Sequence, residues 1–184
     1  MAKWVEIRKG ADYQAISERF HITPFTARLI RNKEIIGEEE IRVYLHGGLS
    51  DLHPASLMKG ISEAAALLRE KIRKQEFIRI IGDYDIDGVC ATYILLRGLR
   101  EAGARVDTDI PDRKRDGYGL NLELVRRAFE AGVDTIITCD NGIAAPKEIA
   151  YAKEQGMTVI VTDHHELQEE VPAADVIVNP RQPE

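Results

Sequence analysis

The sequence lacks the features that mark secreted, disulfide-bonded and membrane-spanning proteins. Its 184 residues include two cysteines, Cys90 and Cys139, and no CxxC pair. A disulfide framework is therefore excluded, and a reducing, intracellular setting is indicated. No apolar run approaches the roughly 20 residues of a membrane span, and the first residues contain no signal-peptide core. We predict a cytoplasmic protein with no membrane partner.

The sequence also lacks an excess of positive charge. It has 25 Lys and Arg residues against 31 Asp and Glu residues, which gives a net charge of −6. This balance disfavours passive binding of nucleic acid by bulk charge, but it allows a phosphate substrate that is held through metal ions. With 44% hydrophobic and 30% charged residues, the chain is long enough for one core of ordinary size and a small appendage.

One acidic stretch stands at the centre of the sequence. Residues 77–82 form a short apolar run that is typical of a buried strand. Asp83, Asp85 and Asp87 follow at every second position, before an apolar helical stretch. Three carboxylates this close repel one another, and a divalent cation among them relieves the repulsion. The alternative is an acidic turn in which an Asp caps the following helix.

From residue 77 onward, strands and helices alternate. This order predicts an α/β fold, a parallel sheet flanked by helices. The expected strands are near-continuous Ile/Val runs, as in strands that are buried on both faces. We expect strands at 77–82, 104–110, 134–139, 157–162 and 175–179, and helices at 88–102, before Gly132 and at 145–154. A long helix at 55–75 precedes them, so the domain spans residues 55–184.

Residues 1–54 differ from the rest and predict a small N-terminal helical module. Short helices are expected at 11–20 and 26–33, with Thr23 as an N-cap before Pro24. A loop is expected at 44–54, which Gly and Pro residues punctuate. Residues 16–30 resemble a helix-turn-helix, but they lack a basic recognition face. We therefore favour a packing module over a DNA-reading one.

Three polar clusters are expected at one edge of the predicted sheet. Ligand sites in open α/β sheets form beyond the carboxyl ends of the strands. The acids at 83, 85 and 87 follow the first strand, Asp140-Asn141-Gly142 follows the third, and Asp163-His164-His165 follows the fourth. Each cluster alone could be turn chemistry or polar surface. Their convergence predicts a metal site.

The donor types in these clusters predict the kind of metal centre. Carboxylates and imidazoles without a thiolate pair suit Mn²⁺ or Mg²⁺, with iron or zinc as alternatives. Five acids, Asp163 included, call for more than one cation, and two metals clamp the oxygens of a phosphoryl transfer. We choose Asp140 as the bridging ligand. His165 or His164, if it does not bind metal, could stabilise the transition state or protonate the leaving oxygen.

A basic loop at 111–121 should lie at the same edge. Arg113 could hold phosphate oxygens, together with its neighbours Lys114 and Arg115. Gly119 would let the backbone approach the substrate closely, and Tyr118 could stack on a base. The alternative is a flexible basic loop without a function in binding.

These motifs resemble those of a known family. Asp163-His164-His165 resembles the signature of the DHH phosphoesterase superfamily, residues 83–88 resemble its first motif, and Asp140-Asn141-Gly142 resembles its second. Ile81 stands where the pyrophosphatase and small-nucleotide branches usually carry a histidine. The Gly-Asp-Tyr-Asp-Ile-Asp-Gly stretch, Pro111-Asp-Arg113 and the Gly-Tyr-Gly-Leu at 117–120 resemble the RecJ branch instead.

The resemblance implies a single-strand-specific DNA exonuclease that works in the 5′-to-3′ direction in recombination and repair. It implies a two-metal site of Mn²⁺ or Mg²⁺, with single-stranded DNA as partner and with a helicase and a single-strand-binding protein as further expected partners. The implied metal-site residues are Asp83, Asp85, Asp87, Asp140 and His164. The implied catalytic residues are Asp140, His164 and His165, and the substrate-binding residues are Arg113, Tyr118, Gly119 and His165.

One departure from the family pattern shapes the expectations for this chain. RecJ proteins are longer, and their fourth metal-binding aspartate has no candidate here before Glu184. We expect a domain truncated at its C-terminal end, with weak metal binding and little or no nuclease activity alone. Two other functions remain open, a small-phosphoester hydrolase and a catalytically silent scaffold. Ile81 argues against the first, and intact Asp85, Asp140 and His164 argue against the second.

Overall fold

A computed structural model describes residues 9–114, 116–117 and 119–183. The chain divides into two compact units, one up to His53 and the other from Pro54 onward. In the described part of the chain, no helix is both long and apolar enough to cross a membrane.

The first unit is helical. It contains α1 (Tyr13–Phe20), α2 (Pro24–Asn32), α3 (Glu38–His46) and the short 3₁₀-helix η1 (Leu49–Asp51). Thr23 is the N-cap of α2, where its hydroxyl accepts a hydrogen bond from the Thr26 N–H at 3.1 Å, as the sequence predicts. Ala27, Ile30 and Ile41 form the buried centre of this unit.

The prediction of a loop at residues 44–54 is wrong at its start, because residues 44–46 are the last turn of α3. Three glutamates occupy the first turn of that helix, where negative charge favours the helix dipole. The Glu40 carboxylate also accepts hydrogen bonds from the N–H groups of Ile36 and Gly37, at 3.1 Å each. This capping stabilises the start of α3, and the helix continues to His46, directly before Gly47 and Gly48.

The second unit is a parallel sheet flanked by helices, as predicted. Its strands are β1 (Phe77–Gly82), β2 (Arg105–Asp109), β3 (Thr135–Cys139), β4 (Thr158–Thr162) and β5 (Val176–Val178). They lie in the order β2-β1-β3-β4-β5, and every neighbouring pair is parallel. The helices are α4 (Ile61–Arg73), α5 (Ile86–Glu101), α6 (Leu122–Glu130) and α7 (Pro146–Glu154), with a short 3₁₀-helix η2 (Ala55–Leu57).

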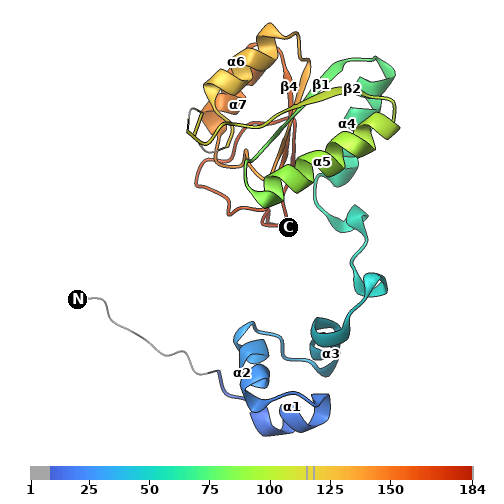
Figure 1. The fold of residues 1–184 in the computed structure, drawn as a ribbon, viewed down its shortest axis with the longest axis vertical. Helices are drawn as coiled ribbons and strands as arrows, with labels where there is room; N and C mark the ends of the chain where they lie inside the picture. The colour runs from blue at the N-terminus through green and yellow to red at the C-terminus, as the bar shows by residue number, and fades with distance from the viewer. Residues whose placement is uncertain (1–8, 115, 118, 184) are drawn as a thin grey trace, which may run out of the picture. The chain divides into compact units, whose positions relative to one another are not determined.

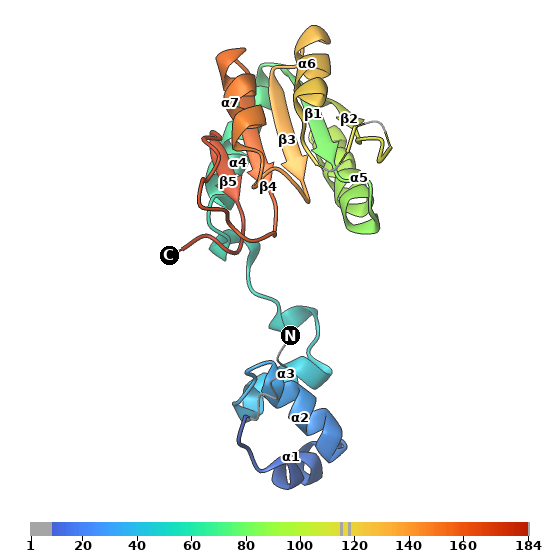
Figure 2. The ribbon, with the colours of Figure 1, turned by 90° about the vertical axis from the view of Figure 1, so that its left-hand side faces the viewer.

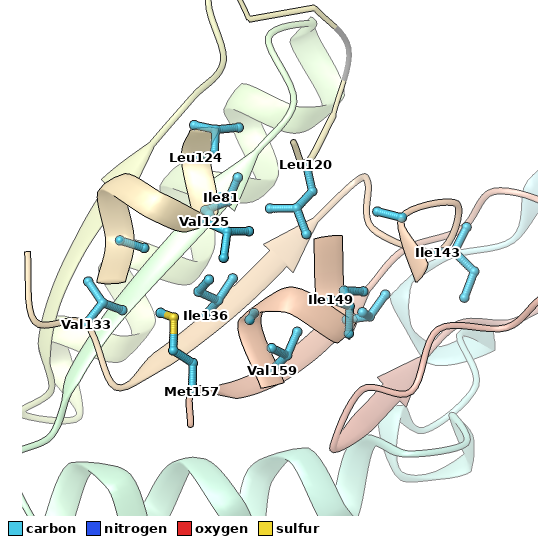
Figure 3. Packing of buried hydrophobic residues seen from close by; sticks show 14 residues of the cluster. Ile81, Leu120, Leu124, Val125, Val133, Ile136, Ile143, Ile149, Met157 and Val159 are labelled. Atoms are coloured by element: carbon cyan, nitrogen blue, oxygen red, sulfur yellow. The ribbon is translucent and has the colours of Figure 1, made fainter. Parts of the chain in front are cut away.

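Helices cover both faces of the sheet (Figures 1 and 2). On the face of α6 and α7, Ile81 and Ile136 of the sheet pack against Val125 and Ile149 of the helices (Figure 3). On the other face, apolar residues of β1, β3 and β4 pack with α4 and α5. Because successive strand residues point to opposite faces, a strand that is covered on both sides is apolar throughout.

The long helix begins later than the sequence suggests, at Ile61 instead of residue 55. Gly60 has a φ of 82°, and a Cβ on it would lie 2.2 Å from the Ile177 carbonyl oxygen. The chain therefore turns sharply at Gly60 before α4 begins. Lys71, near the C-terminal end of α4, is largely buried and pairs with Asp134 at 2.6 Å and with Glu76 at 2.8 Å.

Candidate metal centre

The polar clusters meet where the strand order of the sheet reverses. From β1 the chain goes first to β2 on one side and then to β3 on the other, and ligand sites in open α/β sheets form beyond the carboxyl ends of two such strands. Gly82 and Cys139 are the last paired residues of these strands. Asp83 and Asp140 follow them directly. The sheet topology thus brings together two acids that are 57 positions apart in the sequence.

Two groups of potential metal ligands share one residue. Asp83, Asp85 and Asp140 form one group, and Asp140, His164 and His165 form the other. Within each group, one ligand atom of every residue lies within 4.8 Å of those of the other residues. Asp140 belongs to both groups, which is the position that a ligand between two cations requires.

Asp83 shows how well a cation fits this site. Its side chain is 1% exposed, and its Oδ1 has no hydrogen-bond partner. A buried carboxylate oxygen without a hydrogen-bond donor destabilises the fold, because it loses its hydrogen bonds to water and forms none within the protein. A divalent cation held by the first group would supply the missing interaction.

Asp85 caps a helix and also belongs to a group of potential metal ligands, so the two roles that the sequence posed as alternatives are compatible. It is the N-cap of α5, and its Oδ1 accepts hydrogen bonds from the N–H groups of Asp87 and Gly88, at 3.0 Å each. The same residue belongs to the first ligand group. Asp87 lies in the first turn of α5, is exposed and is in neither group. It lines an apolar groove beside the site, together with Asp140 and His164.

Asp140 occupies an unusual backbone conformation. Its φ of 61° is left-handed, a region that Asp tolerates better than most residues. Burial raises the pKa of its carboxyl, and the nearby Asp85 charge raises it further. The His164 ring opposes this rise, because its Nε2 lies 2.8 Å from the Asp140 Oδ1.

Asp163 organises the histidine segment and lies in neither ligand group. Its Oδ2 accepts a hydrogen bond from the Ile143 N–H at 3.0 Å, and its Oδ1 accepts one from the His164 N–H at 2.7 Å. The Asp163 Oδ1 also lies 2.7 Å from the His165 Nδ1, and this hydrogen bond raises the pKa of His165. This geometry does not support Asp163 as a metal ligand, because both of its carboxylate oxygens already accept hydrogen bonds.

Comparison with known proteins identifies the family. Residues 77–184 match the model of the DHH family, N-terminal domain. The chain belongs to the DHH family. It is 44% identical to the single-stranded-DNA-specific exonuclease RecJ of Bacillus subtilis (strain 168), over 98% of this chain and 23% of that relative. The resemblance that the motifs suggested is thereby confirmed.

Solved structures show the same DHH fold. A crystal structure of exonuclease RecJ bound to manganese is 44% identical, with a TM-score of 0.63, over 67% of this chain and 31% of that one. RecJ of Thermus thermophilus in complex with Mn²⁺ is 32% identical, with a TM-score of 0.65, over 91% of this chain and 23% of that one. This DHH chain thus spans about a quarter to a third of the length of these relatives.

The basic loop of the DHH unit is anchored at several points. The Arg113 guanidinium lies 5.4 Å from the centre of the Tyr84 ring, next to the acids. The Asp116 side chain is almost fully buried and lies 3.7 Å from the Arg127 guanidinium, and its carbonyl accepts a hydrogen bond from Asn121 at 2.9 Å. Gly119 is buried with a φ of 66°. Tyr118, the predicted stacking residue, lies outside the described residues.

Sequence reasoning missed two residues of this DHH site. The sequence predicts Asp163 to be one of the metal-binding acids, whereas its role in holding His165 depends on a loop conformation that no spacing rule reveals. The sequence indicates only a turn at Asn141, but the Asn141 side chain is buried and donates hydrogen bonds to two strand ends. The only available signal was the Asp-Asn-Gly order, because Asn favours local hydrogen bonds to the backbone.

Proposed function

We propose that this chain carries the metal-dependent centre of a phosphodiesterase that degrades single-stranded DNA from the 5′ end. The observation that carries the proposal is the pair of ligand groups that share Asp140, beyond the carboxyl ends of the neighbouring strands β1 and β3. The names of the relatives support the choice of substrate, since they are single-stranded-DNA-specific exonucleases.

The donor set fits Mn²⁺ or Mg²⁺. Asp83, Asp85 and Asp140 would hold one cation, and Asp140 with His164 would hold the other. Oxygen-rich donors with a single imidazole suit these hard cations. Two such cations supply neutralisation of phosphate charge and a water of lowered pKa. Asp87, which lies outside both groups, would act from the rim of the site.

His165 is proposed to hold a proton beside the reacting phosphate. Its Nδ1 is fixed by Asp163, and this hydrogen bond raises the pKa of His165, so that the imidazolium form persists to a higher pH than in an ordinary histidine. An imidazolium in this position could neutralise charge on a phosphate oxygen or give a proton to the leaving oxygen. Its membership of the second ligand group supports this proposed role.

Substrate binding is proposed for the anchored basic loop. Arg113 would contact phosphate oxygens, Gly119 would allow a close backbone approach, and Tyr118 would stack on a base. A helicase that exposes single strands and a single-strand-binding protein are the partners that such an activity implies. We also propose that this nuclease acts in recombination and repair and that it is located in the cytoplasm.

The test uses 3′-labelled, 5′-phosphorylated single-stranded DNA with Mn²⁺. Short RNA and pyrophosphate serve as parallel substrates. The assay is run on this chain and on a chimera in which the remaining sequence of the Bacillus subtilis relative follows residue 184. We expect stepwise shortening of the DNA from its 5′ end by the chimera, weak or no cleavage by the chain alone, and complete loss with Asp140→Ala.

Two outcomes would contradict the proposal. Cleavage of pyrophosphate or RNA without cleavage of DNA would indicate a small-phosphoester hydrolase. Absence of cleavage by the chimera with every substrate would favour a scaffold that has kept the fold without the chemistry. Thr135→Val, at the opposite end of β3, serves as a control and should leave the activity of the chimera unchanged.

A further inference from the structure

Asn141 joins β1 and β3, the two strands that Asp83 and Asp140 directly follow. Its side chain is 2% exposed. Its Nδ2 donates hydrogen bonds to the Ile81 carbonyl oxygen at 3.1 Å and to the Cys139 carbonyl oxygen at 3.0 Å. Both acceptors are carbonyls, so the amide nitrogen and not the amide oxygen must face them.

The position of these hydrogen bonds matters because the two strands separate just beyond them. The ladder between β1 and β3 ends with Gly82 opposite Cys139. The chain then leaves β1 for α5 on one face of the sheet, whereas β3 leads to α7 on the other. Asp83 and Asp140 stand at this divergence. The Asn141 amide thus links the ends of β1 and β3, through carbonyls that lie two residues before Asp83 and one residue before Asp140.

The local turn explains how Asn141 reaches back to the strands. Asp140 takes the left-handed conformation, and Gly142 follows with a φ of 103°. A Cβ on Gly142 would lie 2.5 Å from the Thr138 Oγ1, so only glycine lets the chain fold this tightly over the end of β3. The Asp-Asn-Gly order therefore presents the acid on one side of the turn and buries the amide on the other.

The burial of Asn141 carries a cost that its two hydrogen bonds offset. Its Oδ1 is buried without a hydrogen-bond partner. A buried polar atom without a hydrogen-bond partner destabilises a fold, and an apolar side chain at this position would not have this cost. An aspartate of the same shape would place an oxygen against the two carbonyls and repel them. The geometry favours an amide at this position.

We infer that Asn141 is a positioning residue that fixes the separation of Asp83 and Asp140 and thereby the affinity of the site for divalent cations. The inference deepens the proposed function, because it concerns the same metal centre. It assigns no contact between Asn141 and either the cation or the substrate.

The test measures Mn²⁺ binding to the full chain without nucleic acid, from the electron paramagnetic resonance signal of unbound Mn²⁺. Asn141→Ala and Asn141→Asp should each weaken binding by about 10- to 100-fold, the usual effect of losing a group that orients metal ligands. Thr135→Val is the matched control, since it removes a buried hydroxyl hydrogen bond at the far end of β3 and should leave the affinity unchanged. Wild-type affinity in both Asn141 variants would overturn the inference.

A double-mutant comparison separates positioning from general loss of structure. If Asn141 acts through Asp140, Asn141→Ala should cause little further loss of Mn²⁺ binding in an Asp140→Ala chain. If Asn141→Ala weakens Mn²⁺ binding as much in the Asp140→Ala chain as in the wild type, Asn141 acts independently of Asp140, and the inference is overturned.

A measurement on the wild type covers the case in which the variants do not fold. In ¹⁵N NMR spectra, the side-chain N–H₂ protons of Asn141 should exchange with solvent far more slowly than those of the exposed Gln14. Equal exchange rates would show that the hydrogen bonds from Asn141 to the Ile81 and Cys139 carbonyls are not formed. The Mn²⁺-binding and NMR measurements do not use DNA. If they support the role of Asn141 and the chimera does not cleave DNA, only the proposed function is refuted.

Discussion

Asp163 shows how one carboxylate can organise a site without joining its metal ligands. It is buried next to the exposed histidine pair, and it accepts hydrogen bonds from backbone N–H groups as well as from the His165 ring. Charged acceptors of this kind make the stronger hydrogen bonds of proteins. The orientation of His165 and its tendency to hold a proton therefore both depend on Asp163.

Replacing Asp163 by Asn should lower the pKa of His165 toward its ordinary value. The folded-state pKa is raised, so the stability gained from this pair is present at low pH and is lost as pH rises through that pKa. Histidine ring signals in NMR, followed against pH in the metal-free chain, measure the change. Glu166→Gln removes an equal charge from the next residue and should leave the titration of His165 in place. An unchanged pKa in the Asp163 variant would contradict the assignment.

The close packing of the start of α5 against the end of β1 positions two acids of the metal site. Asp85 caps the helix, and Gly88 in its first turn packs directly on the backbone of Asp83. A Cβ at Gly88 would lie 2.5 Å from the Asp83 carbonyl oxygen. The close approach of this helix to β1 therefore depends on a missing side chain, and it sets where Asp83 and Asp85 stand.

Two glycine-to-alanine changes in α5 should have opposite effects on stability. Gly88→Ala should lower the free energy of unfolding and weaken Mn²⁺ binding, because the added methyl group forces the helix away from Asp83. Gly98→Ala, in open space on the same helix, should raise the free energy of unfolding by roughly 0.5–1 kcal/mol through helix propensity. Urea unfolding of both variants measures the difference. Equal effects at the two positions would contradict the packing argument.

At the scale of the whole molecule, metal binding and stability should be linked. All residues of the two ligand groups and of the two sheet cores belong to the unit from Pro54 onward. A cation that binds only the folded form stabilises it by mass action. From residue 9 to residue 53, the part of the first unit that the structure describes, no residue belongs to these groups.

Mn²⁺ should therefore raise the unfolding temperature of the wild-type chain. At a concentration about 100 times the Kd, the expected gain is about 2.7 kcal/mol. Asp140→Ala should remove this gain, because it takes one ligand from both groups. Calorimetry with and without Mn²⁺ measures the shift, and Thr135→Val should retain it. An equal shift in the Asp140 variant would place the stabilising cation elsewhere.

Much of the architecture was predictable because it follows from simple patterns. The Ile/Val runs located the strands of the sheet, and their alternation with helices indicated parallel pairing. The convergence of the acids and histidines followed from the rule for carboxyl strand ends. The start of α4 was not predictable, since the clash that requires Gly60 involves Ile177, which is remote in the sequence. The roles of Asp163 and Asn141 likewise depend on contacts that only the folded loops create.

The position of Asp140 in both ligand groups has a consequence for the order of folding events. Its partners are Asp83, Asp85, His164 and His165, which follow the carboxyl ends of β1 and β4, and these strands must pair across long stretches of chain. Such non-local pairing is the slow part of folding. A cation finds its ligands only after β1, β3 and β4 are aligned. Mn²⁺ should then slow unfolding while leaving the folding rate unchanged, so that the metal centre retains the native fold without guiding its formation.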